Sequence, residues 1–341
     1  MPDNIVSTWM YVESADEGGL YPQVGGKTTS TDVQNIYWRC VYTFFWSIQT
    51  FKAPTTDLRL VLFTNVTTLP TVDGLDLNKA LADFGVDIVT LQYTWAPKGS
   101  RKAWYNQYFL FDILEHCART MADDDAILVM DNDCLTVRDL APAFARLRKD
   151  GAILMTVGVT EDEEANGISR RGTVDVYAEL GSERPSTVPE YFGGEFYGLT
   201  GSLLRSTMTL ATATRAKNDA LAASGAAYLS DEAHLFSYLM WALGHRAPNA
   251  NDIVRRIWTT WKKNDTRPSD LDLTIWHLPS EKTASFKTLY KLYAATSNSS
   301  HPPRSTLDLL AAVVGVGRKR PLKFIQHFVA AIARSVSLRV S

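Results

Sequence analysis

The sequence predicts an α/β protein built on a mostly parallel sheet with helices on both faces. Three observations support this class. Short apolar segments typical of buried strands alternate with helical segments through the first 130 residues. The composition, with 45% hydrophobic and 21% charged residues, is that of an ordinary globular protein. The length of 341 residues allows one large domain with appendages or two domains, because single cores stop growing at about 250 to 300 residues.

The first half of the chain supplies most of the alternation. Strands are predicted at residues 5–12, 58–63 and 86–91, with helices at residues 33–51 and 78–84 between them. Ser30 offers N-cap chemistry for the first helix, and Pro54 follows its end. Tyr11 lies at the end of the first strand, where it is a candidate to stack on a nucleobase; a buried aromatic residue is the alternative.

An apolar strand then leads directly into two acids. Residues 104–117 predict a helix, and residues 126–130 predict a buried strand that ends at Asp131, Asn132 and Asp133. Ligands of open parallel sheets bind outside the carboxyl ends of the strands. Residues i and i+2 of an extended segment point the same way, so the two carboxylates are suited to Mg²⁺ or Mn²⁺, which neutralises a diphosphate. A polar turn that closes the strand is the alternative interpretation.

The second half is less regular. Strands are predicted at residues 152–159, 253–261 and 273–276, and helices at residues 203–223 and 230–243. Residues 161–189 form a polar connection that we interpret as a lid or an acceptor-facing loop. His277 follows the last strand and precedes Lys282, which makes it a candidate third metal ligand beside a cation for phosphate oxygens. A lone histidine is otherwise more often structural.

A second acidic pair, Asp231 and Glu232, opens the helix at residues 230–243. Its simplest reading is a helix cap, in which acids favour the helix dipole. The preceding glycine and aromatic run contains Gly193, Gly194 and Glu195, where glycines permit a ligand to approach the backbone and aromatic rings can stack on sugars. A carboxylate at a helix N-terminus is also held ionised, as a nucleophile or base requires. Capping and catalysis are therefore compatible.

The end of the chain has a different composition. We place a boundary at residues 297–303, which gives a catalytic domain at 1–296, with halves at 1–135 and 136–296, and an extension at 297–341. After Asp308 no acidic residue occurs, whereas basic residues accompany apolar residues at helical spacing. This basic amphipathic helix is typical of a segment on an anionic membrane surface. Docking of its apolar stripe on the body of the protein is the alternative.

Charge and cysteine content limit the function classes. The 35 basic and 37 acidic residues give a formal charge of −2, without the basic stripe of a nucleic-acid binder. Cys40, Cys117 and Cys134 are widely spaced and form no CxxC pair, which favours buried thiols in a reducing compartment. No secretion signal and no run of about 18 apolar residues are evident. We expect a cytoplasmic protein that acts on a small molecule.

Three blocks resemble known glycosyltransferases. Residues 127–133 resemble the DxD signature of the GT-A fold, whose acids bind a divalent metal on the diphosphate of a nucleotide sugar. The blocks at 191–194 and 230–235 are similar to the retaining transferases of the blood-group A/B type, which implies that Glu232 is the nucleophile and Asp231 a sugar-binding acid. His277 with Lys282 is similar to the glycogenin and lipooligosaccharide galactosyltransferase type, in which a histidine completes the metal site.

The resemblance implies a Rossmann-like GT-A domain that moves a hexose from a UDP-sugar to a glycan, a lipid-linked or a small-molecule acceptor, with retention of configuration. It also implies that Arg101 or Lys102 replaces a donor-binding arginine. Two other classes stay open. Asp131 to Cys134 also imitates the nucleophile motif of haloacid-dehalogenase phosphohydrolases, although Leu135 stands where that family has threonine or valine. A non-catalytic binding module is the third.

Overall fold

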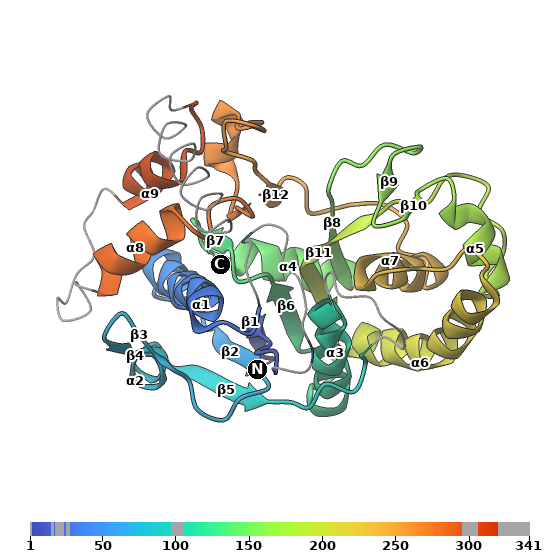
Figure 1. Ribbon diagram of the computed structural model, residues 1–341, viewed down its shortest axis with the longest axis horizontal. Helices are drawn as coiled ribbons and strands as arrows, with labels where there is room; N and C mark the ends of the chain where they lie inside the picture. Colours follow the sequence, from blue (N-terminus) through green and yellow to red (C-terminus); the bar gives the residue numbers. More distant parts are fainter. Residues whose placement is uncertain are drawn as a thin grey trace, which may run out of the picture.

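The computed structural model describes residues 2–14, 17, 24, 28–96, 105–294 and 306–319. Its centre is a six-stranded sheet in the order β5-β2-β1-β6-β11-β8 (Figure 1). The strands are β1 (Asn4–Met10), β2 (Arg59–Thr64), β5 (Val86–Thr90), β6 (Ala126–Met130), β8 (Ala152–Thr156) and β11 (Phe192–Thr200). The first four are mutually parallel, and β11 runs antiparallel between β6 and β8. The predicted α/β class with a mostly parallel sheet is confirmed.

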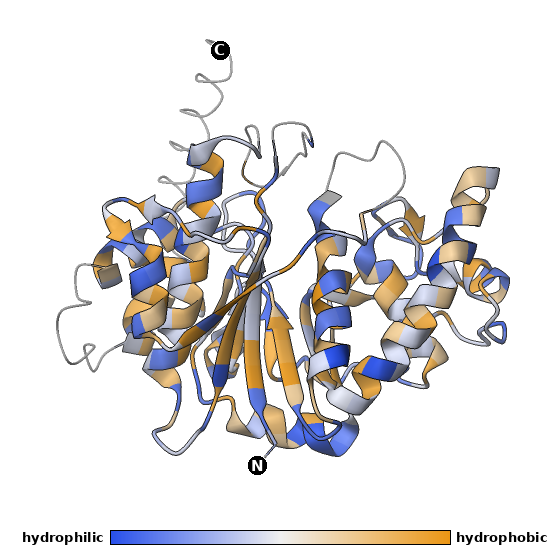
Figure 2. Cartoon of the chain, turned by 90° about the horizontal axis from the view of Figure 1, so that it is seen from below, coloured by the Kyte–Doolittle hydropathy of each residue, from blue (hydrophilic) through white to orange (hydrophobic). Residues whose placement is uncertain are grey.

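Helices cover both faces of this sheet, and Figure 2 shows apolar residues along the strands between them. One core contains residues of α1 (Thr31–Phe51), α2 (Leu77–Asp83), α4 (Ala141–Asp150), α8 (Ser285–Ala294) and α9 (Thr306–Val314). The other contains residues of α3 (Phe109–Thr120), α5 (Thr173–Glu179), α6 (Gly201–Ser224) and α7 (Glu232–Ala242). Successive apolar residues of β2, β6 and β8 alternate between the two cores. Two buried faces explain why these strands are apolar at almost every position.

A smaller sheet lies beside the carboxyl end of β6. It has the order β12-β13-β7, with strands Val254–Arg256, Ile275–His277 and Cys134–Thr136. Its register places Arg256 next to His277, and His277 next to Cys134. Because β7 begins directly after Asp133, its pairing in this sheet brings β12 and β13, which are distant in sequence, close to the end of β6.

Some predicted elements differ from the structure. The strand predicted at 253–261 ends at Arg256, because the chain turns back after Trp258 and pairs Thr259 with Asn264. The connection at 161–189 contains structure of its own: a hairpin of β9 (Glu164–Ala165) and β10 (Ile168–Ser169), followed by α5. The other described elements are β3 (Thr71–Val72), β4 (Leu75–Asp76), η1 (Tyr105–Tyr108) and η2 (Pro268–Asp272).

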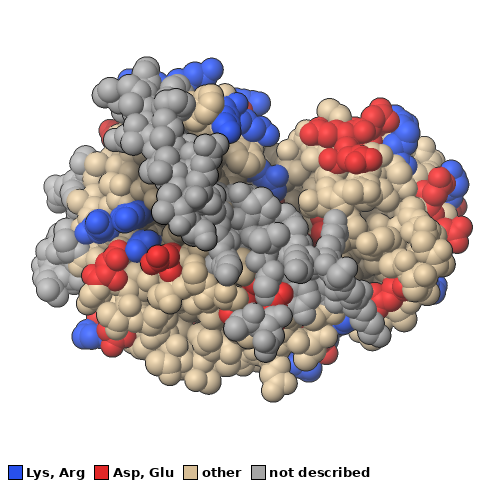
Figure 3. Space-filling view, viewed as in Figure 1, with Lys and Arg blue, Asp and Glu red and all other residues tan. Residues whose placement is uncertain are grey.

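Helix α9 packs on α8 and buries Leu310 and Val314 in the same core. The domain boundary at 297–303 stays a prediction. The basic tail from residue 320 onward lies outside the described residues, as do Arg101 and Lys102, so the membrane-binding helix also stays a prediction. Among the described helices, none combines the length and apolar character needed to cross a bilayer. On the face seen in Figure 3, basic and acidic side chains occur in small separate groups.

Candidate active site

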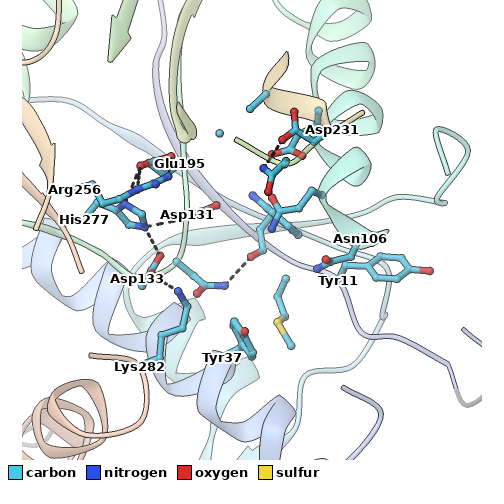
Figure 4. Close-up of a pocket in the computed structure, with 18 of the residues that line it drawn as sticks. Tyr11, Tyr37, Asn106, Asp131, Asp133, Glu195, Asp231, Arg256, His277 and Lys282 are labelled. Atoms are coloured by element: carbon cyan, nitrogen blue, oxygen red, sulfur yellow. Dashed lines mark hydrogen bonds and ion pairs between the residues drawn. The ribbon is translucent and has the colours of Figure 1, made fainter. Parts of the chain in front are cut away.

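A cavity of about 220 Å³ opens where β1 and β6 end. Its walls combine strand ends, the start of α7 and the small sheet. Figure 4 shows Asp133, His277, Glu195 and Arg256 on one side, with Asp231 across from them and Tyr11 beyond. The lining residues are Trp9, Met10, Tyr11, Tyr37, Asn106, Gln107, Asp131, Asn132, Asp133, Asn166, Tyr191, Gly194, Glu195, Asp231, Glu232, Ala233, Arg256, His277 and Lys282.

Asp131, Asp133 and His277 form a compact cluster in this cavity. One ligand atom from each lies within 4.8 Å of the others. Nε2 of His277 is 3.3 Å from Oδ1 of Asp133 and 3.9 Å from Oδ2 of Asp131. The two acids sit on a turn, closed by Cys134 N–H donating to the Asp131 carbonyl, and not on an extended segment as predicted. The turn still brings both carboxylates to the same imidazole.

The surroundings of the cluster shift the pKa values of the two aspartates in opposite directions. Burial, followed by the charge of Asp133, raises the pKa of Asp131 to about 7. Burial also acts to raise the pKa of Asp133, but Lys282 and His277 outweigh it and hold that pKa well below its usual range. Burial acts to lower the pKa of His277, whereas Asp133 and Glu195 raise it to about 9. Asp131 is therefore the aspartate that is protonated more easily, whereas His277 and Lys282 favour the ionised form of Asp133.

These residues fit a divalent cation. Oδ1 of Asp133 is buried and, within the described part of the chain, accepts no hydrogen bond of regular geometry; Nε2 of His277 lies 3.3 Å from it. A divalent cation held by these residues would compensate the buried carboxylate charge. Two carboxylates and one imidazole are a donor set that suits Mn²⁺ or Mg²⁺ with further oxygen ligands. The His277 ligand position that the sequence predicts thus coincides with this cluster.

Lys282 is buried beside the cluster, where its ammonium group contacts the Asp133 carboxylate. Burial acts to lower the pKa of Lys282, but the charges of Asp133 and Asp131 raise it above its ordinary value. Lys282 therefore carries a positive charge at neutral pH. Its side chain also lies above the Tyr37 ring, with 6.0 Å between the nitrogen and the ring centroid.

Glu195 connects the cluster to the small sheet. Its carboxylate accepts two hydrogen bonds from Arg256, with Nε at 2.6 Å and Nη2 at 2.8 Å. Nδ1 of His277 lies 3.1 Å from Oε1 of the same carboxylate, as an ion pair that lacks regular hydrogen-bond geometry. Burial acts to raise the pKa of Glu195, but Arg256 and His277 keep it well below the usual range. Glu195 is thus an ionised group almost completely enclosed by protein.

Gly193 and Gly194 make room for two carboxylates. A Cβ atom on Gly193 would lie 2.5 Å from Oε2 of Glu195, and one on Gly194 would lie 2.5 Å from Oε1 of Glu232. The pairing of β11 with β8 shifts its register in this part of the strand, which is typical of strands beside active sites. The predicted substrate-binding role of Gly193, Gly194 and Glu195 stays a prediction. The absence of a side chain at Gly193 and Gly194 is already explained by the space that the carboxylates of Glu195 and Glu232 occupy.

Asp231 is the N-cap of α7. Its Oδ1 accepts from the backbone N–H of His234 at 2.7 Å and lies 2.6 Å from Nδ1 of the same residue. Its Oδ2 accepts hydrogen bonds from Asn166 and from the hydroxyl of Tyr191. Burial acts to raise the pKa of Asp231, but these contacts, led by His234, lower it overall. Asp231 is therefore ionised and held in one orientation.

Glu232 follows as the first residue of α7 and is 7% exposed. Burial and the neighbouring charge of Asp231 raise its pKa well above the ordinary value. The two adjacent acids therefore have pKa values displaced in opposite directions, a pattern common in acid–base sites. The sequence-based expectation that the helix N-terminus keeps the carboxylate ionised applies to Asp231 better than to Glu232.

Tyr11 lines the cavity but is also packed into protein. Its ring contacts Tyr93 and Phe109 at centroid distances of 4.9 and 5.2 Å, and its hydroxyl donates to Glu17. The nucleobase-stacking role stays a prediction, as do the donor contacts of Arg101 and Lys102.

Several lining residues were not predicted from the sequence. Tyr37 and Asn106 belong to no motif, and Asn166 lies within the connection at 161–189, for which the sequence predicts a lid or an acceptor-facing loop. Arg256 had a detectable signal, because a charged pair at residues 255 and 256 interrupts an otherwise apolar strand segment.

Comparisons with known proteins give only a distant structural likeness. No protein-family model matches the chain, and no curated protein sequence does. The solved structures that it resembles include an active-site mutant of LgtC (10% identity, TM-score 0.49) and galactosyltransferase LgtC with donor and acceptor sugar analogues (11%, 0.47). Each match covers 88% of this chain and 98% of the other.

A third similar structure is mouse xyloside xylosyltransferase 1 in its apo form, with 12% identity, a TM-score of 0.48, and coverage of 81% of this chain and 97% of the other. All three are glycosyltransferases by these descriptions. Likeness at this level does not determine an activity, so the function must be inferred from the residues of the cavity.

Proposed function

We propose that the chain is a metal-dependent glycosyltransferase with the GT-A fold that transfers a hexose from a UDP-sugar to a glycan, a lipid-linked or a small-molecule acceptor. The observation that carries this proposal is the cluster of Asp131, Asp133 and His277 in the same cavity as Glu232. An anion-binding metal site and a separate carboxylate in one cavity match the needs of breaking a sugar–diphosphate bond.

That reaction needs stabilisation of the negative charge on the leaving diphosphate and of the positive charge that grows at the anomeric carbon. A divalent cation held by Asp131, Asp133 and His277 would neutralise the diphosphate leaving group. Lys282 places a second positive charge beside Asp133, where it can bind phosphate oxygens. Asp231 is oriented by His234 and Asn166, and we assign it to binding donor hydroxyls.

We assign to Glu232 a role at the anomeric carbon of the donor sugar. For retention, it would attack that carbon or stabilise the positive charge that grows there as the leaving group departs. For this it must lose its proton, and it must lie on the face of the sugar opposite the diphosphate. The proposed retention rests on this assignment.

Hydrolysis of UDP-glucose and UDP-galactose without an acceptor tests the proposed function. A transferase is expected to release UDP slowly in the presence of Mn²⁺ and to stop when EDTA is added. A phosphohydrolase would instead cleave simple phosphate esters such as p-nitrophenyl phosphate, and a binding module would do neither. Cleavage of phosphate esters without release of UDP would refute the transferase assignment.

The Gly194→Ala variant is expected to lower kcat by about 100-fold, because the new methyl group would displace the Glu232 carboxylate and a shift of about 1 Å can cost that factor. Binding of UDP and Mn²⁺ should change little. Gly172→Ala is the matched control, since the atoms nearest to its methyl group would belong to Ile168 and Ser169, which do not line the cavity. Steady-state kinetics and calorimetric titration distinguish the two effects; an unchanged kcat in Gly194→Ala would argue against a catalytic Glu232.

A further inference from the structure

We infer that Glu195 is a positioning residue for the metal site: it orients the His277 ring through Nδ1 and is itself held by Arg256. This inference rests on the proposed metal site and extends it. It assigns to Glu195 a role toward a metal ligand in place of the predicted contact with substrate.

Glu195 is connected to two of the three proposed ligands. Its backbone carbonyl accepts a hydrogen bond from the N–H of Asp131 at 3.0 Å, and its carboxylate lies 3.1 Å from Nδ1 of His277. Its side chain is 1% exposed, so water has little access to these contacts. The residue thus ties the end of β6 to the end of β13.

The placement of the carboxylate determines how His277 can bind a metal. A carboxylate beside Nδ1 favours the proton on that nitrogen. Nε2, which faces Asp133 and Asp131, is then left with its lone pair for a cation. Without Glu195, either nitrogen could carry the proton, and the ring could rotate.

Arg256 explains how an ionised carboxylate is kept in this enclosed place. Arg256 and His277 are register partners on adjacent strands of the small sheet. The guanidinium binds both oxygens of Glu195, which fixes the plane of the carboxylate. Gly193 leaves the space that this arrangement occupies.

The same strand offers a matched control. Arg255, the preceding residue, makes a similar two-point contact with the buried Asp270, with Nε at 2.9 Å and Nη2 at 2.7 Å. Asp270 does not line the cavity. Asp270→Asn and Glu195→Gln therefore each remove one charge from a buried arginine pair, but only the second contacts a proposed metal ligand.

The test is Mn²⁺ affinity of the full chain, measured by electron paramagnetic resonance of free Mn²⁺, with thermal unfolding recorded in parallel. We expect Glu195→Gln to weaken Mn²⁺ binding 10- to 100-fold, as is typical for partners of metal-binding histidines. Asp270→Asn should lower thermal stability but leave the affinity within about twofold. Equal affinities in Glu195→Gln and the wild type would overturn the inference.

A second comparison excludes the effect that an unpaired Arg256 guanidinium could have on Mn²⁺ affinity. In Arg256→Met, Glu195 still has His277 as a charged partner, whereas in Glu195→Gln/Arg256→Met that charged contact is lost with no unpaired guanidinium left behind. The double variant is expected to bind Mn²⁺ at least tenfold more weakly than Arg256→Met. Equal binding by these two variants would mean that Glu195 serves only as a counter-ion for Arg256.

Pulsed electron paramagnetic resonance of bound Mn²⁺ in protein with nitrogen-15-labelled histidine supplies the signature of positioning, with the His277 signal identified by its loss in a His277→Gln variant. The wild type should show hyperfine coupling from one coordinated imidazole nitrogen, and the double variant, whose ring is no longer oriented, should lose or weaken that coupling. Weaker Mn²⁺ binding with an unchanged coupling would show that Glu195 acts by charge alone, which rejects positioning. Absence of any Mn²⁺ binding by the wild type would instead refute the proposed metal site itself.

Discussion

The Asp133→Ala variant is expected to lose Mn²⁺-dependent UDP binding and turnover. Asp133 is 1% exposed, and its carboxylate contacts both His277 and Lys282. Its removal takes away a proposed metal ligand and one negatively charged partner of both His277 and Lys282. Because even partners of metal ligands alter affinity 10- to 100-fold, we expect a loss of Mn²⁺ affinity above about 100-fold. Calorimetric titration of UDP with and without Mn²⁺ measures it.

The Asp131→Ala variant is expected to lose metal binding without losing stability. Its side chain is 23% exposed, and its pKa is raised to about 7 by burial and by Asp133. Removing it relieves repulsion between two acids, so the folded protein should be as stable as the wild type or more so. Asp133→Ala should be less stable by about 3 to 5 kcal/mol, the usual effect of breaking a buried pair. Full turnover in either variant would contradict the metal assignment.

The end of β6 could be predicted from sequence because its signals are local. Five apolar residues followed by Asp131 and Asp133 define a buried strand and its carboxyl end, and the structure has the strand at the predicted residues. His277 could be proposed by the same rule, since it closes another short strand. In both cases the position of a polar residue relative to one strand was sufficient.

The contacts of Glu195 could not be predicted, because they depend on long-range pairing. Glu195 lies on β11, which inserts antiparallel beside β6, and no local pattern fixes that neighbour. Arg256 reaches it from a strand of three residues that exists only through pairing with β13. The glycines at 193 and 194 suggested space for a ligand, whereas the structure shows that the space also holds the carboxylates of Glu195 and Glu232.

The Glu232→Gln variant is expected to bind UDP and Mn²⁺ as the wild type does and to lose turnover by at least about 1,000-fold. Glutamine has the shape of a protonated glutamic acid, the form that burial and Asp231 favour in the folded protein. Binding and folding should therefore be preserved. Glutamine cannot become an anion, so attack on the anomeric carbon or stabilisation of its positive charge is lost. Titration of UDP and assay of transfer check the two halves separately.

The raised pKa of Glu232 gives an independent check. A carboxyl group whose pKa is raised by folding stabilises the protein fully below its unfolded pKa of about 4.3, and that contribution is lost as the pH rises through the folded value. Glu232→Gln has no such loss, so its stability advantage over the wild type should grow above about pH 4.3 in urea unfolding. An advantage that does not change with pH would mean that Glu232 is ionised in the resting protein. Retained turnover in Glu232→Gln would mean that its negative charge is not used in the reaction, and the retaining mechanism would then need another nucleophile.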